Sequence, residues 1–156
     1  LDGPSREFRE SGATLVIMEA FDRRGPPTLL TWLILSRRGL KSPPDLVQSI
    51  YGAASPRTEI ASLAELVELA AAQRDAPSIS ILNEAAFELA EIVRAVYFRL
   101  GSFSMPLILS GGVILHSANL RSAFRRACEQ LALTFPETIE VPEPAAGALM
   151  IARRLV

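Results

Sequence analysis

The stretch MPLILSGGVILHSANLRSAFRRACEQLALTFPETIEV, residues 105–141, decides the fold class of this chain. A short apolar run at about 106–110 leads into Gly111-Gly112, which is typical of a buried strand that enters a tight turn. A helix is expected over about 117–133, because a serine stands at the N-cap position and apolar residues recur on one face. Residues 138–141 form a second strand candidate. Strand, helix and strand in this order predict a right-handed parallel βαβ crossover with adjacent strands.

Upstream of this stretch the apolar pattern is helical. Ser62 and Glu65 match the S-x-x-E capping box, which favours a helix start there. Helices are expected at about 13–23, 45–51, 62–73 and 78–100, with a loop at 53–61. A further helix is expected to be opened by Pro26-Pro27 and to end at a C-cap at Gly39. In the longest helix, apolar residues recur every three or four positions at Ile81, Leu82, Ala85, Leu89, Ile92, Val93 and Val96.

A last helix is expected at 145–155, and it is apolar on nearly all sides until Arg153 and Arg154. Such a helix needs a surface in which to bury itself. Two parallel strands also do not form a sheet that stands alone, because parallel sheets bury both faces. The chain is therefore expected to be part of a larger α/β protein with further strands upstream.

The composition excludes several classes of protein. The chain has 156 residues, 49% apolar and 21% charged, as in an ordinary soluble globular domain. Its formal net charge of −1 gives no reason to expect a nucleic-acid or acidic-membrane partner. No apolar run reaches membrane-spanning length, and the first residues lack the apolar region of a signal peptide. The single cysteine, Cys128, excludes an internal disulfide framework and fits a reducing compartment, so a cytoplasmic location is expected.

The segments PLILSGGVILHSANLRSAFRRACEQLAL and IEVPEPAAGALMIARRL resemble the C-terminal signature of the N-acetylglucosamine kinase and BadF/BadG/BcrA/BcrD ATPase family. In that family a strand ends in a Gly-Gly pair, a helix follows, and a second strand leads to a proline and a Gly-Ala helix. The matching residues here are Gly111-Gly112, Pro144 and Gly147-Ala148. The helical segments upstream resemble the family's helical subdomain.

The family is a branch of the actin-like ATPase superfamily, and this implies the fold. The chain is expected to be the C-terminal part of a ribonuclease H-like domain, mostly helical with a short parallel sheet. Its helical part is expected at about 13–100 and its βαβα part at about 105–155, with the N-terminal lobe absent.

The resemblance also implies site residues. Glycines at the end of a strand let a ligand approach the backbone, and in the family this turn lies against the adenosine of ATP, which marks Gly111 and Gly112 as nucleotide-binding. Ala61 occupies the position where the helical subdomain touches the adenine side. The family's Gly-Asp-Glu-Gly-Ser motif aligns with residues 9–13, which implies that Glu10 and Gly12 bind sugar, with Glu10 replacing the Asp. Plain turn geometry, helix packing and a solvated charge near a frayed end remain the alternatives for these positions.

The activity implied is that of a sugar kinase that uses ATP and Mg²⁺ to phosphorylate N-acetylglucosamine or a related amino sugar. The superfamily's Asp-Gly-Gly-Gly-Thr phosphate loop and Gly-Thr-Gly-Ser turn do not occur in this sequence. The catalytic base is therefore unassigned, no metal ligand is expected, and the chain alone is expected to be inactive. A homodimer is left open. The alternatives are a BadF-type ATPase that activates a reductase, which a single cysteine fits poorly, and a non-catalytic binding module.

Other conspicuous side chains point to structure rather than chemistry. His116 has no second histidine and no adjacent cysteine for a metal site, so a surface role is expected. Trp32 is expected in an interface or the core, and Cys128 in the core. Solvated faces are expected for Arg37, Arg38, Arg121, Arg125 and Arg126.

Overall fold

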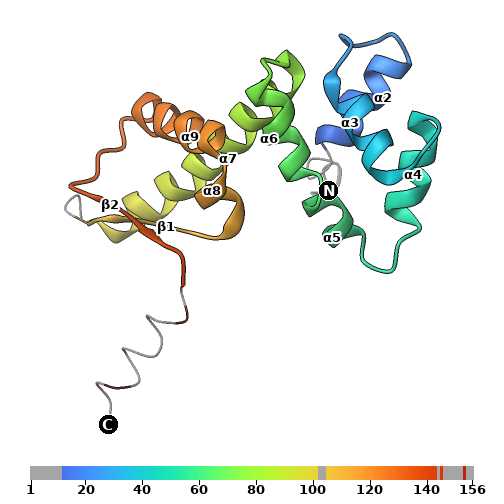
Figure 1. Cartoon of the computed structure of the whole chain (residues 1–156). Coiled ribbons are helices and arrows are strands. Elements are labelled where there is room, and N and C mark those ends of the chain that lie inside the picture. The colour runs from blue at the N-terminus through green and yellow to red at the C-terminus, as the bar shows by residue number, and fades with distance from the viewer. Residues whose placement is uncertain (1–11, 102–104, 144, 146–152, 154–156) are drawn as a thin grey trace, which may run out of the picture. The chain divides into compact units, whose positions relative to one another are not determined.

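The computed structural model describes residues 12–101, 105–143, 145 and 153 of the chain (Figure 1). The chain forms two compact units, Leu1–Glu84 and Ala85–Val156. Within the described residues the first unit is helical, and the second contains two strands with the helices that accompany them.

The first unit is built around helix α3 (Leu29–Arg38), which contacts α2 (Gly12–Phe21), α4 (Pro43–Tyr51) and α6 (Ala64–Ala72). The short helix α5 (Pro56–Ala61) follows α4, and α7 (Ala76–Leu100) begins in this unit. Apolar residues that recur every three or four positions supply the core. Its largest fully buried apolar side chains are Ile17, Leu30, Ile34, Leu46 and Ile50.

The ends of α3 show how local sequence sets this arrangement. Gly39 takes a φ of 64°, which a glycine adopts without strain, and this confirms the predicted C-cap. The prediction that Pro26-Pro27 open the helix is wrong, because Thr28 is the N-cap and its hydroxyl accepts a hydrogen bond from the Leu30 amide. Prolines do open the next helix, α4, where Pro43 and Pro44 stand in the first turn.

Two predictions around residues 53–65 are wrong. The expected loop contains helix α5, which begins with proline in its first turn after Ser55. The expected capping box does not form, because the Ser62 hydroxyl donates to the Glu59 carbonyl at 2.6 Å and α6 begins only at Ala64. The capping box of this unit belongs instead to α4, where Ser42 and Asp45 bond each other's backbone.

The second unit contains the predicted parallel strand pair. Strand β1 (Leu107–Ser110) pairs in parallel with β2 (Thr138–Val141), in a register that places Leu107 opposite Thr138 and Ser110 opposite Val141. Helix α9 (Ala118–Gln130) connects them, and the Ser117 hydroxyl caps it by accepting from the Leu120 amide at 3.0 Å. The predicted order of strand, helix and strand and the parallel pairing of the two strands are therefore confirmed.

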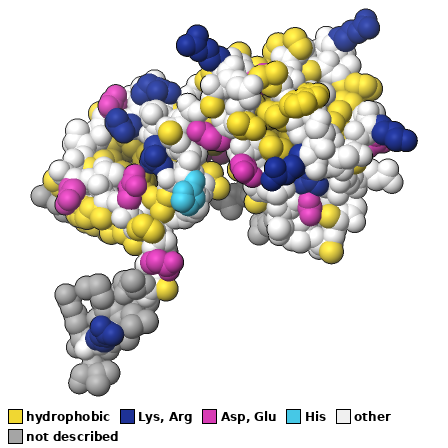
Figure 2. All heavy atoms as spheres, viewed as in Figure 1, with side chains coloured by type: hydrophobic (Ala, Val, Ile, Leu, Met, Phe, Trp, Pro, Cys, Tyr) yellow, Lys and Arg dark blue, Asp and Glu magenta, His cyan; other side chains and the backbone are white. Residues whose placement is uncertain are grey.

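Two features of this unit differ from expectation. A five-residue helix, α8 (Gly112–His116), lies between β1 and α9 where only a turn was expected. Strand β1 is less buried than predicted, because Ile108 is 60% exposed while Leu107 and Leu109 are partly covered. Apolar side chains are accordingly visible at the surface (Figure 2).

The buried side of α7 also differs from the predicted face. Its length was predicted almost correctly, and Leu82 of the predicted face is buried, but Ile92 and Val96 are exposed. The buried side chains of α7 also include Ala86, Ala90 and Tyr97, which the predicted face did not contain. Periodicity revealed an apolar side but not which side is covered.

The predicted helix at 145–155 lies outside the described residues except for Ala145 and Arg153, and so do Pro144 and Gly147-Ala148 of the resemblance. Among the helices described, none combines the length and the apolar character that crossing a bilayer requires.

Candidate functional site

The glycine turn lies where β1 ends and α8 begins. Gly111 adopts φ 104° and ψ 144°, a conformation that strains any residue with a side chain, so this position requires glycine for backbone reasons. Gly112 does not have a positive φ, and no heavy atom lies within 4 Å of the position that a Cβ would occupy there. Neither backbone strain nor crowding within the described structure therefore explains the second glycine.

The turn is also placed at the edge where parallel strands end. Ser110 and Val141, the last residues of β1 and β2, are partners in the register. Gly111 follows Ser110 directly, and both glycines are exposed. In open α/β sheets, ligands bind outside the carboxyl ends of the strands.

The helix that directly follows the turn is α8, which has only five residues, because α9 begins at Ala118, after α8 has ended. Such a short helix has a much smaller dipole than a long one, so it contributes little to binding a phosphate at this turn.

Arg121 holds this short helix in place. Its Nη1 donates to the carbonyl of Ile114 at 3.1 Å and to the carbonyl of Leu115. Its Nε lies 3.7 Å from a carboxylate oxygen of Glu140 on β2. The prediction that Arg121 is simply solvated is wrong, because a guanidinium has five donors and these carbonyls at a helix end lack intrahelical partners. Sequence spacing contained no signal for this contact.

Ala61, the third predicted nucleotide-binding residue, lies in the first unit. It is the exposed last residue of α5, and the capped helix expected to start beside it at Ser62 does not form there. The prediction that it shares one adenosine site with the glycine turn remains a prediction, since Ala61 and the turn belong to different units.

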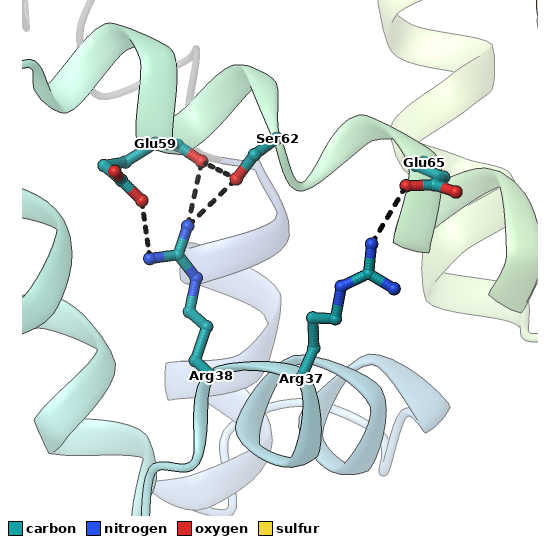
Figure 3. A network of polar contacts seen from close by, with 5 residues as sticks. All are labelled: Arg37, Arg38, Glu59, Ser62 and Glu65. Carbon is teal, nitrogen blue, oxygen red and sulfur yellow. Dashed lines mark hydrogen bonds and ion pairs between the residues drawn. The ribbon is translucent and has the colours of Figure 1, made fainter.

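The segment beside Ala61 is held by arginine (Figure 3). Arg38 forms an ion pair with Glu59 at 2.7 Å and also donates to the Glu59 carbonyl and to the Ser62 hydroxyl. Its side chain is only 15% exposed, so the prediction of a solvated Arg38 is wrong. Arg37 makes a looser, exposed contact of 3.5 Å with Glu65. Together these contacts bind the α5–α6 connection to α3.

The predicted sugar-binding residues are only partly described. Glu10 lies outside the described residues, and Gly12 is the first residue of α2. A Cβ on Gly12 would lie 3.6 Å from the Ile81 side chain, an ordinary contact, so neither crowding nor a positive φ demands glycine there. Nearby in the same helix, the buried hydroxyl of Thr14 has no hydrogen-bond partner among the residues that the structure describes.

A hollow of about 370 Å³ lies between α9 and one face of the sheet, and its lining includes Leu107, Phe124 and Cys128. Cys128 is buried, as predicted. Burial raises the pKa of its thiol, and the neighbouring Glu129 carboxylate raises it further. The thiol is therefore a protonated core group, and the hollow does not include the glycine turn.

Comparison with known proteins gives one informative match. Over 141 residues, 87% of this chain, the sequence is 37% identical to an N-acetylmuramic acid/N-acetylglucosamine kinase of Clostridium acetobutylicum. The chain is related to a sugar kinase. The match covers 45% of that kinase, so the chain spans about half the length of the curated relative. No protein-family description matches the chain. No solved structure matches it either.

The sugar-kinase relationship agrees with the broad activity that the resemblance implied, while the residue roles remain predictions. Two side chains that the sequence assigned to structure rather than chemistry, His116 and Trp32, are both exposed. His116 is exposed at the end of α8, and Trp32 is 69% exposed, so Trp32 is not a core residue. In the part of the chain that the structure describes, no group of three histidine, cysteine or acidic side chains could hold a metal ion.

Proposed function

We propose that this chain is part of an ATP-dependent sugar kinase and that it supplies the adenosine side of the nucleotide site at Gly111-Gly112. The observation that carries the proposal is the empty space above Gly112, where a Cβ would meet nothing within 4 Å. A glycine with neither strain nor crowding to explain it suits a position that a ligand approaches closely. Its place at the carboxyl end of parallel strands adds support.

The reaction and substrate are inferred from the relative. Its name describes a kinase of N-acetylmuramic acid and N-acetylglucosamine, so we propose an amino sugar as the acceptor and ATP as the donor. Glu10 and Gly12 remain the proposed sugar contacts, and Ala61 a proposed neighbour of the adenine. Mg²⁺ accompanies ATP in phosphoryl transfer, but the described residues offer no cluster that fits it, so we assign no residue to the metal.

The proposed role for this chain is binding rather than complete catalysis. Phosphoryl transfer requires the γ-phosphate, the metal ion, a base and the acceptor hydroxyl to be held together. The proposed residues provide an adenosine wall and a sugar contact. We therefore propose that the remaining groups come from an N-terminal lobe, in a cytoplasmic enzyme. No structural observation favours the reductase activator, since Cys128 is buried with a raised pKa and is poorly placed to hold an iron–sulfur cluster.

Substitutions at Gly112 test the nucleotide site. ATP affinity of the 156-residue chain is measured by calorimetry for Gly112→Ala and Gly112→Val. Each side chain enters space that is free in the protein but that the proposal gives to the nucleotide, so affinity should fall with alanine and be abolished with valine. Thermal stability should not fall in the alanine variant, because alanine favours helix by up to about 1 kcal/mol over glycine.

The Gly112→Ala variant thus serves as a control for the assignment, because it should lose ATP affinity without losing thermal stability. ATP affinity that stays unchanged in a folded Gly112→Val variant would show that the nucleotide does not bind over this turn. The same measurement on Val113→Ala, a neighbouring exposed position, should leave affinity close to that of the unmodified chain.

A further inference from the structure

The hollow beside α9 is a feature separate from the glycine turn. It has a volume of about 370 Å³ and lies within the second unit, between α9 and one face of the sheet. Small-molecule sites of this size are lined mainly by apolar side chains, with a few polar groups that fix the orientation of the ligand. The hollow has this composition, and its apolar lining consists of Leu107, Leu109, Phe124, Cys128, Leu133 and Phe135.

Helix α9 contributes two rows of side chains to the hollow. Phe124 and Cys128 are four residues apart, on one side of the helix, and both are buried, so they form an apolar floor. Arg125 and Glu129 each follow one position later, and they are exposed while also lining the hollow. The charged row therefore stands at the rim beside the floor. A molecule in the hollow has apolar contacts beneath it and one cation and one anion beside it.

The two charges at the rim do not neutralise each other. Neither the Arg125 guanidinium nor the Glu129 carboxylate has an ion pair among the residues that the structure describes. Opposite charges four residues apart on a helix can pair, but the order with the basic residue first is the less favourable one. Arg121, which also lines the hollow, already contacts Glu140 at 3.7 Å. Arg125 and Glu129 therefore remain available to a ligand.

These two charges select a class of ligand. A simple carboxylic acid would be attracted by Arg125 and repelled by Glu129, and a simple amine would meet the reverse. A molecule that carries both a carboxylate and an ammonium group satisfies both side chains. Their Cα atoms are about 6 Å apart along the helix axis, and the side chains are long enough to converge on groups attached to a single carbon atom. An α-amino acid has this arrangement, and an apolar side chain on it would cover the floor.

We propose that this hollow binds a free amino acid with a large apolar side chain, such as leucine or phenylalanine, whose carboxylate pairs with Arg125 and whose ammonium group pairs with Glu129. The ligand's side chain lies over Phe124 and against Leu107 of the sheet. The guanidinium offers two parallel donors to a carboxylate, which fixes the orientation of the ligand. The site is distinct from the glycine turn, and the proposal does not depend on the sugar-kinase assignment.

The ligand class is tested with analogues that each lack one charge. Binding to the 156-residue chain is measured by nuclear magnetic resonance titration with leucine, phenylalanine, phenethylamine, which lacks the carboxylate, and hydrocinnamate, which lacks the ammonium group. The amino acids should bind with dissociation constants of about 1 mM or tighter. Each analogue should bind at least about tenfold more weakly than phenylalanine. Absence of binding by both amino acids, or analogues that bind as tightly as phenylalanine, overturns the proposal.

Substitutions at the rim test which side chain recognises which charge. Arg125→Gln should abolish the preference for phenylalanine over phenethylamine, because the carboxylate loses its partner, and Glu129→Gln should abolish the preference over hydrocinnamate. A merely structural effect would weaken all the ligands alike. Arg126→Gln is the matched control, since Arg126 is adjacent in α9 but does not line the hollow, and it should leave the affinities unchanged. Circular dichroism confirms that each variant is folded. A preference that survives its substitution, or an equal loss in Arg126→Gln, overturns the assigned contacts.

Discussion

Replacing Asp75 with alanine removes an acceptor that joins the starts of two helices. Its carboxylate accepts from the Thr28 hydroxyl at 2.8 Å and the Leu29 amide at 2.9 Å, at the start of α3. It also accepts from the amide of Ser78 at 3.1 Å and from the Ser78 hydroxyl, in the first turn of α7. Asp75 itself is 8% exposed, so water cannot easily replace these bonds.

The magnitude follows from these contacts. Loss of one N-cap acceptor costs about 0.5–2 kcal/mol. Asp75→Ala removes the acceptor for the Ser78 amide in the first turn of α7, and with it the acceptor for the Leu29 amide and the Thr28 hydroxyl at the start of α3. We expect Asp75→Ala to lower the free energy of unfolding by about 2–4 kcal/mol. Asp75→Asn should lose less, because an amide keeps one acceptor oxygen but presents an NH₂ group to donors.

The pH dependence has a definite sign. Burial raises the pKa of Asp75. The hydrogen bonds from Ser78, Leu29 and Thr28 together lower it by more than burial raises it, so the pKa lies below its usual value of 3.8. A lowered pKa in the folded state means that the carboxylate stabilises the fold above about pH 4 and that this stability is lost as the pH falls through the folded-state pKa. The alanine variant should show a flatter decline below pH 4.

Urea denaturation followed by circular dichroism measures these differences. Asp45→Ala is the matched control, because Asp45 caps only its own helix, bonding the Ser42 amide at 2.9 Å. It should cost about 1 kcal/mol. If Asp75→Ala proves no more destabilising than Asp45→Ala, the idea that Asp75 links two helices energetically is refuted.

Two further outcomes are expected. Cys128 should react with a thiol reagent at pH 7.5 at least about tenfold more slowly in the folded chain than in urea. The reason is that burial keeps the thiol protonated and out of reach of the reagent. Equal rates in the two conditions would show that the thiol is accessible in the folded chain. In a coupled assay with ATP and N-acetylglucosamine, glucose or other hexoses, the purified chain should turn over far below about 1 s⁻¹, and a rate above that would show that residues 1–156 contain a complete active site.

The parallel strand pair could be predicted from sequence because its signals are local. A short apolar run ends in two glycines, and Ser117 stands directly before the apolar face of α9. Helix ends marked by glycine, such as the one at Gly39, were predicted for the same reason. Each signal acts within a few residues of the feature it predicts.

The wrong predictions fall where contacts between distant residues determine the structure, or where a sequence motif is only weakly specific. Ser62 matches a capping motif, but its hydroxyl bonds backward to Glu59, because serine can satisfy either direction. Asp75 binds residues 46 and 47 positions away, and no local pattern predicts such partners. Arg38 is covered by a helix expected to be a loop. Periodicity in α7 similarly identified apolar residues without showing which would meet a neighbour.

The candidate site was only partly predictable. The glycine pair was found from its place in the sequence, and the structure adds that the two glycines differ, because Gly111 is required by φ and Gly112 is not. The role of Arg121 was missed because it binds backbone carbonyls, which every residue provides and no side-chain pattern reveals.

That last contact has a consequence for how freely this segment can vary. A helix of five residues cannot persist through its own hydrogen bonds, so α8 depends on the guanidinium at its carboxyl end. Because the arginine bonds main-chain oxygen atoms, substitution of the side chain at Ile114 or Leu115 should leave both hydrogen bonds in place. The shape of this segment therefore depends on Gly111 and on Arg121, a residue of the next helix, more than on the side chains of α8 itself.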